Sequence, residues 1–166
     1  MTTYDLIIIG GGASGLMAAV SAKLNNKNTK ILILEKNDIL GKKILITGKG
    51  RCNITTSNTD LHEFITKLGK NGKFLYSTLS QFTIQDTIDF FNNILKIETK
   101  VERGNRIFPC SDSAKQVVNA FAEKLKELNV EIKFNTKVKK FNFDVNENRI
   151  ESVETSNGEF FAKNFL

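Results

Sequence analysis

The sequence predicts an α/β domain built around a parallel sheet, and three observations lead to this fold class. A short apolar run at 6–9 ends in glycines, an alanine-rich helical pattern follows, and a second apolar run occupies 31–34. Apolar runs that alternate with helical patterns are typical of parallel strands buried on both faces. Near the C-terminus, short runs separated by Asn- and Gly-containing turns predict an antiparallel β-meander.

The turn after the first run has the spacing G-x-G-x-x-G, with Gly10, Gly12 and Gly15 at the fixed positions. Each glycine has its own steric reason in such a turn. Gly10 makes the tight turn, Gly12 lets the backbone approach a pyrophosphate, and Gly15 lets the helix pack closely on the strand. The pattern therefore indicates a Rossmann-like dinucleotide-binding unit, with a purely structural glycine turn as the alternative.

The helix that follows begins at Ala13, and we expect Leu16, Ala19, Val20 and Leu24 on its inward side. Its free N–H groups and the positive end of its dipole should face the diphosphate.

Glu35 ends the second apolar run, 20 positions beyond Gly15. A carboxylate at this position can accept hydrogen bonds from the hydroxyls of an adenosine ribose, and it would repel a phosphate on that ribose. The unit is therefore predicted to prefer FAD or NAD over NADP.

The segment 41–56 combines glycines, fixed cations and small polar side chains. Backbone N–H groups in such a segment suit phosphates and polar ring edges, although composition alone fits a basic surface loop equally well. Its place directly after the dinucleotide unit favours a ligand loop.

The rest of the chain predicts peripheral helices and then a return to the sheet. Asp60 or the preceding Thr59 can cap one helix and Thr83 another. Arg103-Gly-Asn105 predicts a hairpin, and Ser113 with Gln116 predicts a capping box. A parallel strand is expected at 130–134. Runs at 138–143, 149–155 and 159–163, separated by turns at 146–148 and 157–158, predict a meander that covers one side of the sheet, and a new strand is expected to begin at 163–166.

Length and composition bound the kind of protein. The 166 residues are enough for one domain with a core, and no apolar run reaches membrane-spanning length. Since the N-terminus lacks the basic flank and cleavage site of a signal peptide, we expect a cytoplasmic protein without a membrane partner. Cys52 and Cys110 form no C-x-x-C pair and His62 is the only histidine, so we predict no redox dithiol and no metal site.

The formal net charge is +6, which suits an anionic cofactor and would also suit nucleic acid. Because the lysines are scattered and no recognition motif with interleaved aromatics is evident, we predict no nucleic-acid partner. The sequence does not indicate an oligomeric state.

The chain resembles the two-dinucleotide-binding-domain flavoproteins related to aminoacetone oxidase and to bacterial bile-acid-reducing flavoenzymes. Three matches occur in the order of the family. They are Gly-Gly-Gly-Ala-Ser-Gly at 10–15 with Glu35-Lys36, the run from Lys42-Lys43 through Thr-Gly-Lys-Gly-Arg-Cys-Asn at 47–53 to Thr56, and Gly-Asn-Arg-Ile-Phe-Pro-Cys-Ser at 104–111 followed by Ala114. The chain departs from the commoner family pattern at Lys49, where glycine is frequent, and at Thr56, where Asn is usual.

The resemblance implies FAD as the cofactor, with contacts from the first two matches and from the backbone of Val138 at the adenine. Arg51 is our candidate for tuning charge near the flavin or a phosphate, and no catalytic residue is identified. The full set of expected cofactor-binding residues is Gly10, Gly12, Ala13, Ser14, Gly15, Glu35, Lys36, Lys43, Thr47, Gly48, Gly50, Arg51, Cys52, Asn53 and Val138.

By the same resemblance, we predict the FAD-binding part of a flavin-dependent oxidoreductase that transfers hydride between a small organic substrate and flavin, with NAD(P)H as a candidate electron donor. Residues 1–166 would form a partial FAD-binding domain, incomplete at the C-terminus, without the inserted substrate domain or the C-terminal segment that closes over the flavin, and too short to be active alone. Two alternatives stay open: an NAD-binding dehydrogenase domain in which 36–56 is an unrelated loop, and a truncated, non-catalytic nucleotide-binding fragment.

Overall fold

A computed structural model describes residues 3–144 and 149–166, which form two compact units. The first unit contains the residues up to Ile44 together with Phe121–Leu166, and the second contains Leu45–Ala120. The predicted turn at 146–148 lies outside the described residues.

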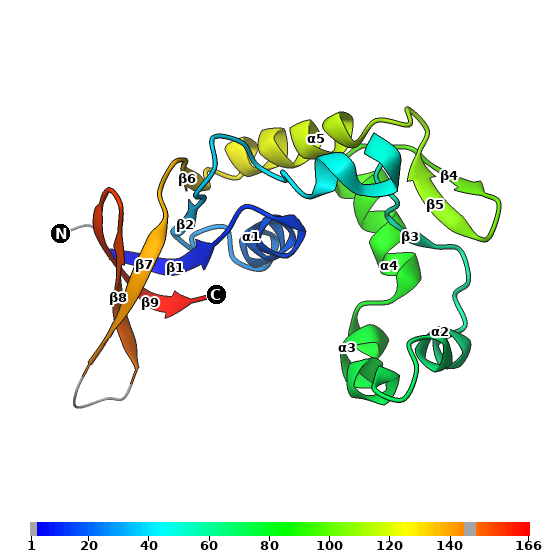
Figure 1. The fold of residues 1–166 in the computed structure, drawn as a ribbon, viewed down its shortest axis with the longest axis horizontal. Coiled ribbons are helices and arrows are strands. Elements are labelled where there is room, and N and C mark those ends of the chain that lie inside the picture. Colours follow the sequence, from blue (N-terminus) through cyan, green and yellow to red (C-terminus); the bar gives the residue numbers. More distant parts are fainter. Residues whose placement is uncertain (1–2, 145–148) are drawn as a thin grey trace. The chain divides into compact units, whose positions relative to one another are not determined.

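The first unit is built on a six-stranded sheet in the order β6-β2-β1-β9-β8-β7 (Figure 1). Its parallel part consists of β1 (Thr3–Ile9), β2 (Ile31–Leu34) and β6 (Glu131–Lys133), together with β9 (Gly158–Phe165), which pairs parallel with β1. Every residue of β2 is buried, as expected for a strand covered on both faces. The core beside these strands is formed by Tyr4, Ile7, Leu32, Leu34, Val153 and Ala162.

The meander consists of β7 (Val138–Phe143), β8 (Ile150–Thr155) and β9 (Gly158–Phe165). It does not form a layer over one side of the sheet, as the sequence suggested, because hydrogen bonds join it to β1 edge to edge. Phe161 pairs with Ser152 of β8 and with Thr3 of β1. No Gly or Pro interrupts 159–166, so the predicted third run and the predicted new strand are one continuous strand. The α/β class, with a parallel sheet and an antiparallel meander, is confirmed.

Helix α1 (Ala13–Asn25) connects β1 to β2 and buries Leu16, Ala19 and Val20 as predicted. The fourth inward position was predicted wrongly, because Leu24 is 44% exposed whereas Lys23 is only 6% exposed. Positions 16, 19, 20 and 23 follow one helical stripe at i, i+3, i+4 and i+7. The apolar stem of Lys23 lies in that stripe, and its Nζ donates to the carbonyl oxygen of Lys27 at 3.0 Å.

The second unit is largely helical, with a small sheet in the order β3-β5-β4. Of the two candidate caps for α2 (Leu61–Lys67), Asp60 is the one that caps the helix, and Thr83 forms a capping box with Asp86 at the start of α4 (Ile84–Asp89). The predicted hairpin is also present, with Val101 paired to Ile107. The first element, η1 (Ile44–Gly50), begins at the last residue of the first unit's N-terminal segment. The elements that follow are β3 (Thr55–Thr56), α2 (Leu61–Lys67), η2 (Gly72–Leu75), α3 (Tyr76–Gln81), α4 (Ile84–Asp89), η3 (Phe90–Ile94), β4 (Thr99–Glu102) and β5 (Arg106–Pro109).

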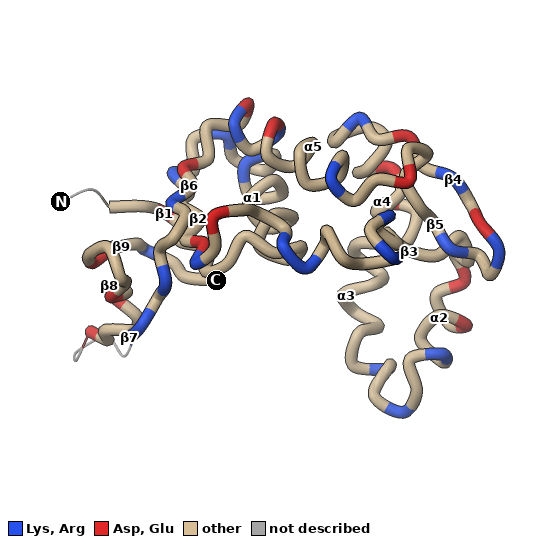
Figure 2. The backbone as a smooth tube through the Cα atoms, turned by 45° about the horizontal axis from the view of Figure 1, so that its top comes forward, with Lys and Arg blue, Asp and Glu red and all other residues tan. Residues whose placement is uncertain are grey.

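Helix α5 (Ala114–Glu127) carries the chain from the second unit to the first. Half of its predicted capping box forms, since the Oγ of Ser113 accepts from the Gln116 N–H at 3.3 Å. The other half does not, because the side-chain oxygen of Gln116 accepts from the hydroxyl of Ser111. Basic residues are spread along the chain in both units (Figure 2).

Candidate functional site

The glycines of the turn between β1 and α1 are required for different reasons. Gly10 has a positive φ of 105°, which suits glycine. A Cβ on Gly15 would overlap the carbonyl oxygen of Gly10 and lie 3.1 Å from Cγ2 of Ile8. The structure therefore agrees with the expected roles of these two residues, a tight turn and close contact between helix and strand.

Gly12 differs from both because its surroundings within the protein do not require glycine. Its φ of −83° is accessible to any residue. Apart from its chain neighbours, no atom of the described residues lies within 4 Å of the position that a Cβ would occupy. The space beside Gly12 is therefore open for a ligand that approaches the backbone.

The N-terminus of α1 has unused hydrogen-bond donors. No side chain of the described residues caps this helix, and its first turn contains no acidic residue. Gly12, Ala13 and Ser14 are all exposed. Free N–H groups and the helix dipole make such an end suitable for a phosphate group.

Glu35 is buried, with 6% of its surface exposed, and its carboxylate is engaged by the protein. Its Oε2 accepts from the Gly11 N–H at 2.7 Å, and its Oε1 accepts from the backbone and side-chain nitrogens of Asn37 at 2.8 and 2.6 Å. A carboxylate has about four acceptor positions, so about one remains on Oε2 for a ribose hydroxyl. The carboxylate therefore stabilises the glycine turn, and about one of its acceptor positions is not used by the described residues.

Gly11 and Asn37 were missed by the sequence reasoning. A Cβ on Gly11 would overlap Cδ2 of Leu40 and lie 3.3 Å from the Glu35 carboxylate, so a larger residue there would displace these two side chains. The available signal was the run of three consecutive glycines at 10–12, because the G-x-G-x-x-G spacing requires only the first and the third of them.

Three further predicted contacts belong to the same unit. Lys36 and Lys43 are exposed, and Val138 is half-buried against the core at the start of β7. The segment before Val138 is held beside Glu35, since the Thr136 N–H donates to the Glu35 carbonyl oxygen at 2.9 Å. The first unit thus brings together the glycine turn, Glu35 and the chain leading into Val138.

The loop 47–53 belongs to the second unit, and its backbone is unusual. Gly48 and Lys49 both have left-handed conformations, with φ of 55° and 58°, and Gly50 has a φ of 84°. A Cβ on Gly48 would lie 2.9 Å from both the Asn53 nitrogen and Cε1 of Phe108. Packing within the unit therefore requires glycine at position 48.

Arg51 is engaged by the hairpin and the segment after it. Its Nη1 lies 2.9 and 3.0 Å from the two carboxylate oxygens of Glu102 and 3.4 Å from Oδ1 of Asp112. The guanidinium lies over the ring of Phe108, 4.2 Å from its centroid. Lys100 and, less strongly, Arg51 lower the pKa of the Asp112 carboxyl. These contacts give Arg51 a role in holding this unit together.

Cys52 and Asn53 also make internal contacts. The Cys52 thiol is buried, and burial raises its pKa, so it is poorly suited to act as a thiolate. The Cys52 N–H donates to the Thr47 carbonyl oxygen at 3.1 Å. With its amide nitrogen facing the acceptors, Asn53 donates to the carbonyl oxygens of Thr55 and Ile107, both at 3.2 Å.

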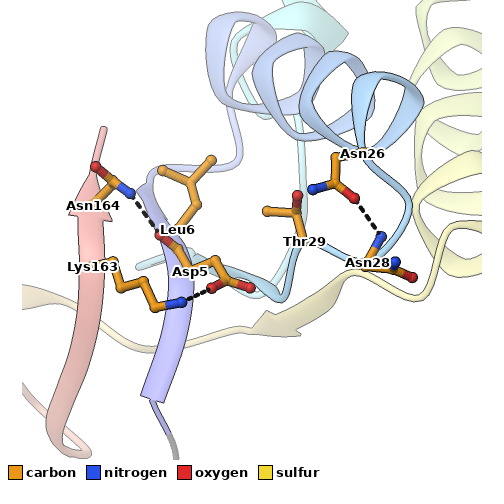
Figure 3. A pocket seen from close by; sticks show the side chains of 7 residues that line it. All are labelled: Asp5, Leu6, Asn26, Asn28, Thr29, Lys163 and Asn164. Carbon is orange, nitrogen blue, oxygen red and sulfur yellow. Dashed lines mark hydrogen bonds and ion pairs between the residues drawn. The ribbon is translucent and has the colours of Figure 1, made fainter.

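A polar pocket of about 540 Å³ lies at the opposite end of β1 from the glycine turn (Figure 3). There Asp5 accepts from Lys163 Nζ at 2.7 Å, which helps to lower the pKa of Asp5, and the Asn164 amide donates to the Asp5 carbonyl oxygen at 3.1 Å. Ligands of open α/β sheets bind outside the carboxyl ends of the strands, so this pocket lies at the wrong end for the dinucleotide.

Metal sites and membrane-spanning helices are both absent from the part of the chain that the structure describes. This part contains no group of three or more His, Cys, Asp or Glu side chains placed to hold a metal ion. None of its helices is both long and apolar enough to cross a membrane.

Comparisons with known proteins agree with this geometry. The family model of the HI0933-like protein Rossmann domain matches residues 4–166. The chain is 39% identical to the 3-dehydro-bile acid delta(4,6)-reductase of Clostridium scindens over 125 residues, which is 75% of this chain and 29% of the relative. It is 32% identical to the ribosomal RNA dihydrouridine synthase of Escherichia coli over 138 residues, which is 83% of this chain and 33% of the relative.

Among solved structures, the open conformation of a flavocytochrome c3 fumarate reductase superposes with a TM-score of 0.73 at 15% identity, covering 99% of this chain and 33% of that one. The likeness concerns the fold. The chain spans about a third of the length of the two curated relatives.

Proposed function

This chain belongs to the HI0933-like family of Rossmann-fold, FAD-binding proteins, and on that premise we propose that it is the FAD-binding part of an oxidoreductase that transfers hydride between flavin and a small organic substrate. We further propose that residues 1–166 form a partial domain and that the substrate domain lies outside them, because the chain spans about a third of its curated relatives.

The open space beside Gly12 is the observation that carries this proposal. Neither backbone conformation nor packing by the described residues requires glycine there, so a close-lying ligand is the remaining reason. The uncapped end of α1 would bind the diphosphate through its N–H groups, and the free acceptor position of Glu35 would bind the adenosine ribose. FAD, when bound, supplies hydride transfer at N5 of its ring system.

The names of the two relatives suggest the substrate class. A delta(4,6)-reductase and a dihydrouridine synthase are both named for adding hydrogen across a carbon–carbon double bond. We therefore propose reduction of a double bond conjugated to a carbonyl group, with NAD(P)H as the electron donor. A cytoplasmic location belongs to the same proposal, because both cysteines are free thiols.

A nucleic-acid substrate is the second candidate. The sequence argued against a nucleic-acid partner, but a relative that aligns with 83% of this chain is named as a synthase acting on ribosomal RNA. The formal net charge of +6 is compatible with such a substrate.

The test is a titration of the 166-residue chain with FAD and, separately, with NAD, on the wild type and on a Gly12→Ala variant. The added methyl group should obstruct the diphosphate and weaken FAD binding on the order of tenfold. Asn25→Ala, at the other end of α1, is the matched control and should bind FAD as the wild type does.

The possible outcomes separate the alternatives. NAD binding tighter than FAD binding would favour an NAD-dependent dehydrogenase domain. Equal FAD affinity of the wild type and Gly12→Ala would contradict the site. FAD binding without any turnover of an unsaturated carbonyl substrate, in a protein extended to the length of its relatives, would favour the non-catalytic nucleotide-binding alternative.

A further inference from the structure

The helical part of the second unit contains a cavity that the cofactor proposal does not use. Its volume is about 650 Å³, which falls within the range of about 300–1,000 Å³ typical of small-molecule sites. None of the expected cofactor-binding residues lines it. The lining residues are His62, Ile65, Thr66, Gly69, Lys70, Lys73 and Tyr76.

Close backbone contact fixes the walls of this cavity. Helix α2 ends at Lys67, and Gly69, with a φ of 77°, turns the chain back toward it. A Cβ on Gly72 would overlap the carbonyl oxygen of Ile65 and lie 3.1 Å from Cβ of Leu68. Because glycine at position 72 allows η2 to pack directly on α2, the cavity is part of the folded unit.

The cavity combines an apolar wall with cations. Ile65 is buried, and the ring of Tyr76 and the stems of the lysines add apolar surface. Lys70 and Lys73 are exposed and form no ion pair with any residue in 3–144 or 149–166. Lys67, on the same turn but outside the lining, differs because its Nζ lies 2.5 Å from Oε1 of Glu63. The lysines of the lining therefore remain available for an anion.

We propose that this cavity binds an amphipathic organic carboxylate, with its apolar body against Ile65 and Tyr76 and its carboxylate at Lys70 and Lys73. An apolar enclosure with a few charged groups at one side is complementary to such a molecule. Basic positions follow one another along the turn between α2 and α3, where the carboxylate would bind (Figure 2). The proposal is independent of FAD binding, because it rests on residues 62–76 alone.

The test uses cholate as the probe, below its micelle-forming concentration, and isothermal titration calorimetry of the 166-residue chain. Replacing both Lys70→Gln and Lys73→Gln should weaken cholate binding about tenfold, since two charge contacts are lost. Lys115→Gln, which removes an exposed lysine of the same unit outside the cavity, is the matched control and should leave binding unchanged. The methyl ester of cholate should bind the wild type about tenfold more weakly than cholate does.

A second variant tests the enclosure itself. Thr66→Phe places a ring at the lining and should abolish cholate binding while circular dichroism and FAD affinity stay at wild-type values. Equal cholate affinity of the wild type and the double lysine variant would overturn the proposal, as would an equal loss in Lys115→Gln. Lysine-dependent binding of an RNA oligonucleotide in place of cholate would overturn it as well, because it would identify a nucleic-acid surface.

Discussion

The glycine turn of the first unit and the loop 47–53 of the second have similar compositions but different surroundings. Gly12 has open space where a side chain would stand, whereas Gly48 is enclosed by Asn53 and Phe108. The N–H groups at the start of α1 lack a side-chain cap, whereas the guanidinium of Arg51 is held by Glu102 and Asp112. Space and N–H donors thus remain open at Gly12 and the start of α1, whereas the glycine and the cation of the loop 47–53 are used by internal packing.

This difference shows why composition alone does not identify a binding loop. A glycine required by the protein's own packing and one required by a ligand look alike in the sequence, but the space that a Cβ would occupy distinguishes them in the fold. The ligand contacts expected of residues 47–53 stay a prediction. Substitutions in both regions test whether each residue serves internal packing, a ligand or both.

The largest effect is expected for Gly15→Ala. The new Cβ would overlap the Gly10 carbonyl oxygen, so α1 must move away from β1 at a cost of about 3 kcal/mol. Urea unfolding of the variant and the wild type measures this loss. Gly12→Ala, three residues earlier, is the control and should change stability by less than about 1 kcal/mol. Equal stabilities of the two variants would contradict the contrast between these glycines.

A smaller loss of stability is expected for Glu35→Gln. Three N–H donors face the carboxylate, and the glutamine amide turns one of its own donors toward them. The unpaired donors should cost about 2 kcal/mol, again measured by urea unfolding. Glu123→Gln, at a position on α5 away from the glycine turn, should be neutral. If Glu35→Gln were also neutral, the carboxylate would have no structural role and would serve the ligand alone.

The sequence predicted most elements whose signals are local. Asp60 and Thr83 cap helices because their side chains reach N–H groups three residues later, which depends only on nearby sequence. The G-x-G-x-x-G spacing likewise predicted the close contact at Gly15.

Features decided by competition between alternative side chains or partners were not predicted. The sequence could not show that Ser111 would engage Gln116, or that the stem of Lys23 would replace Leu24 in the buried stripe of α1. The continuity of β9 also escaped prediction, because its two halves pair with strands that lie far apart in the chain. The hydrogen-bond and ion-pair partners of Glu35 and Arg51 were not predicted for a similar reason. Each side chain has several possible partners in the sequence, and only the fold decides which of them it contacts.

Arg51→Ala tests the contacts of the second region. Loss of a partly exposed ion pair and of the cation–π contact with Phe108 should destabilise the chain by about 1 kcal/mol. Urea unfolding measures this change, and Arg103→Ala on the adjacent turn is the control. The same variant tests charge tuning of the cofactor, because FAD affinity and the flavin spectrum would both have to change if Arg51 acted on the flavin or a phosphate. Unchanged values would leave Arg51 with its internal role only.

The smallest change in stability is expected for Lys49→Gly, which should stabilise the chain whereas the other substitutions destabilise it. Lys49 has φ 58° and ψ 42°, a left-handed conformation that strains any residue with a Cβ. Glycine removes this strain but increases the freedom of the unfolded chain, so the net stabilisation should be about 0.5 kcal/mol. Lys43→Gly is the control: Lys43 is also an exposed lysine but does not have a positive φ, and the substitution should destabilise the chain. A destabilising Lys49→Gly would mean that the entropy of the unfolded chain, or a contact of the lysine side chain, outweighs the backbone strain at position 49.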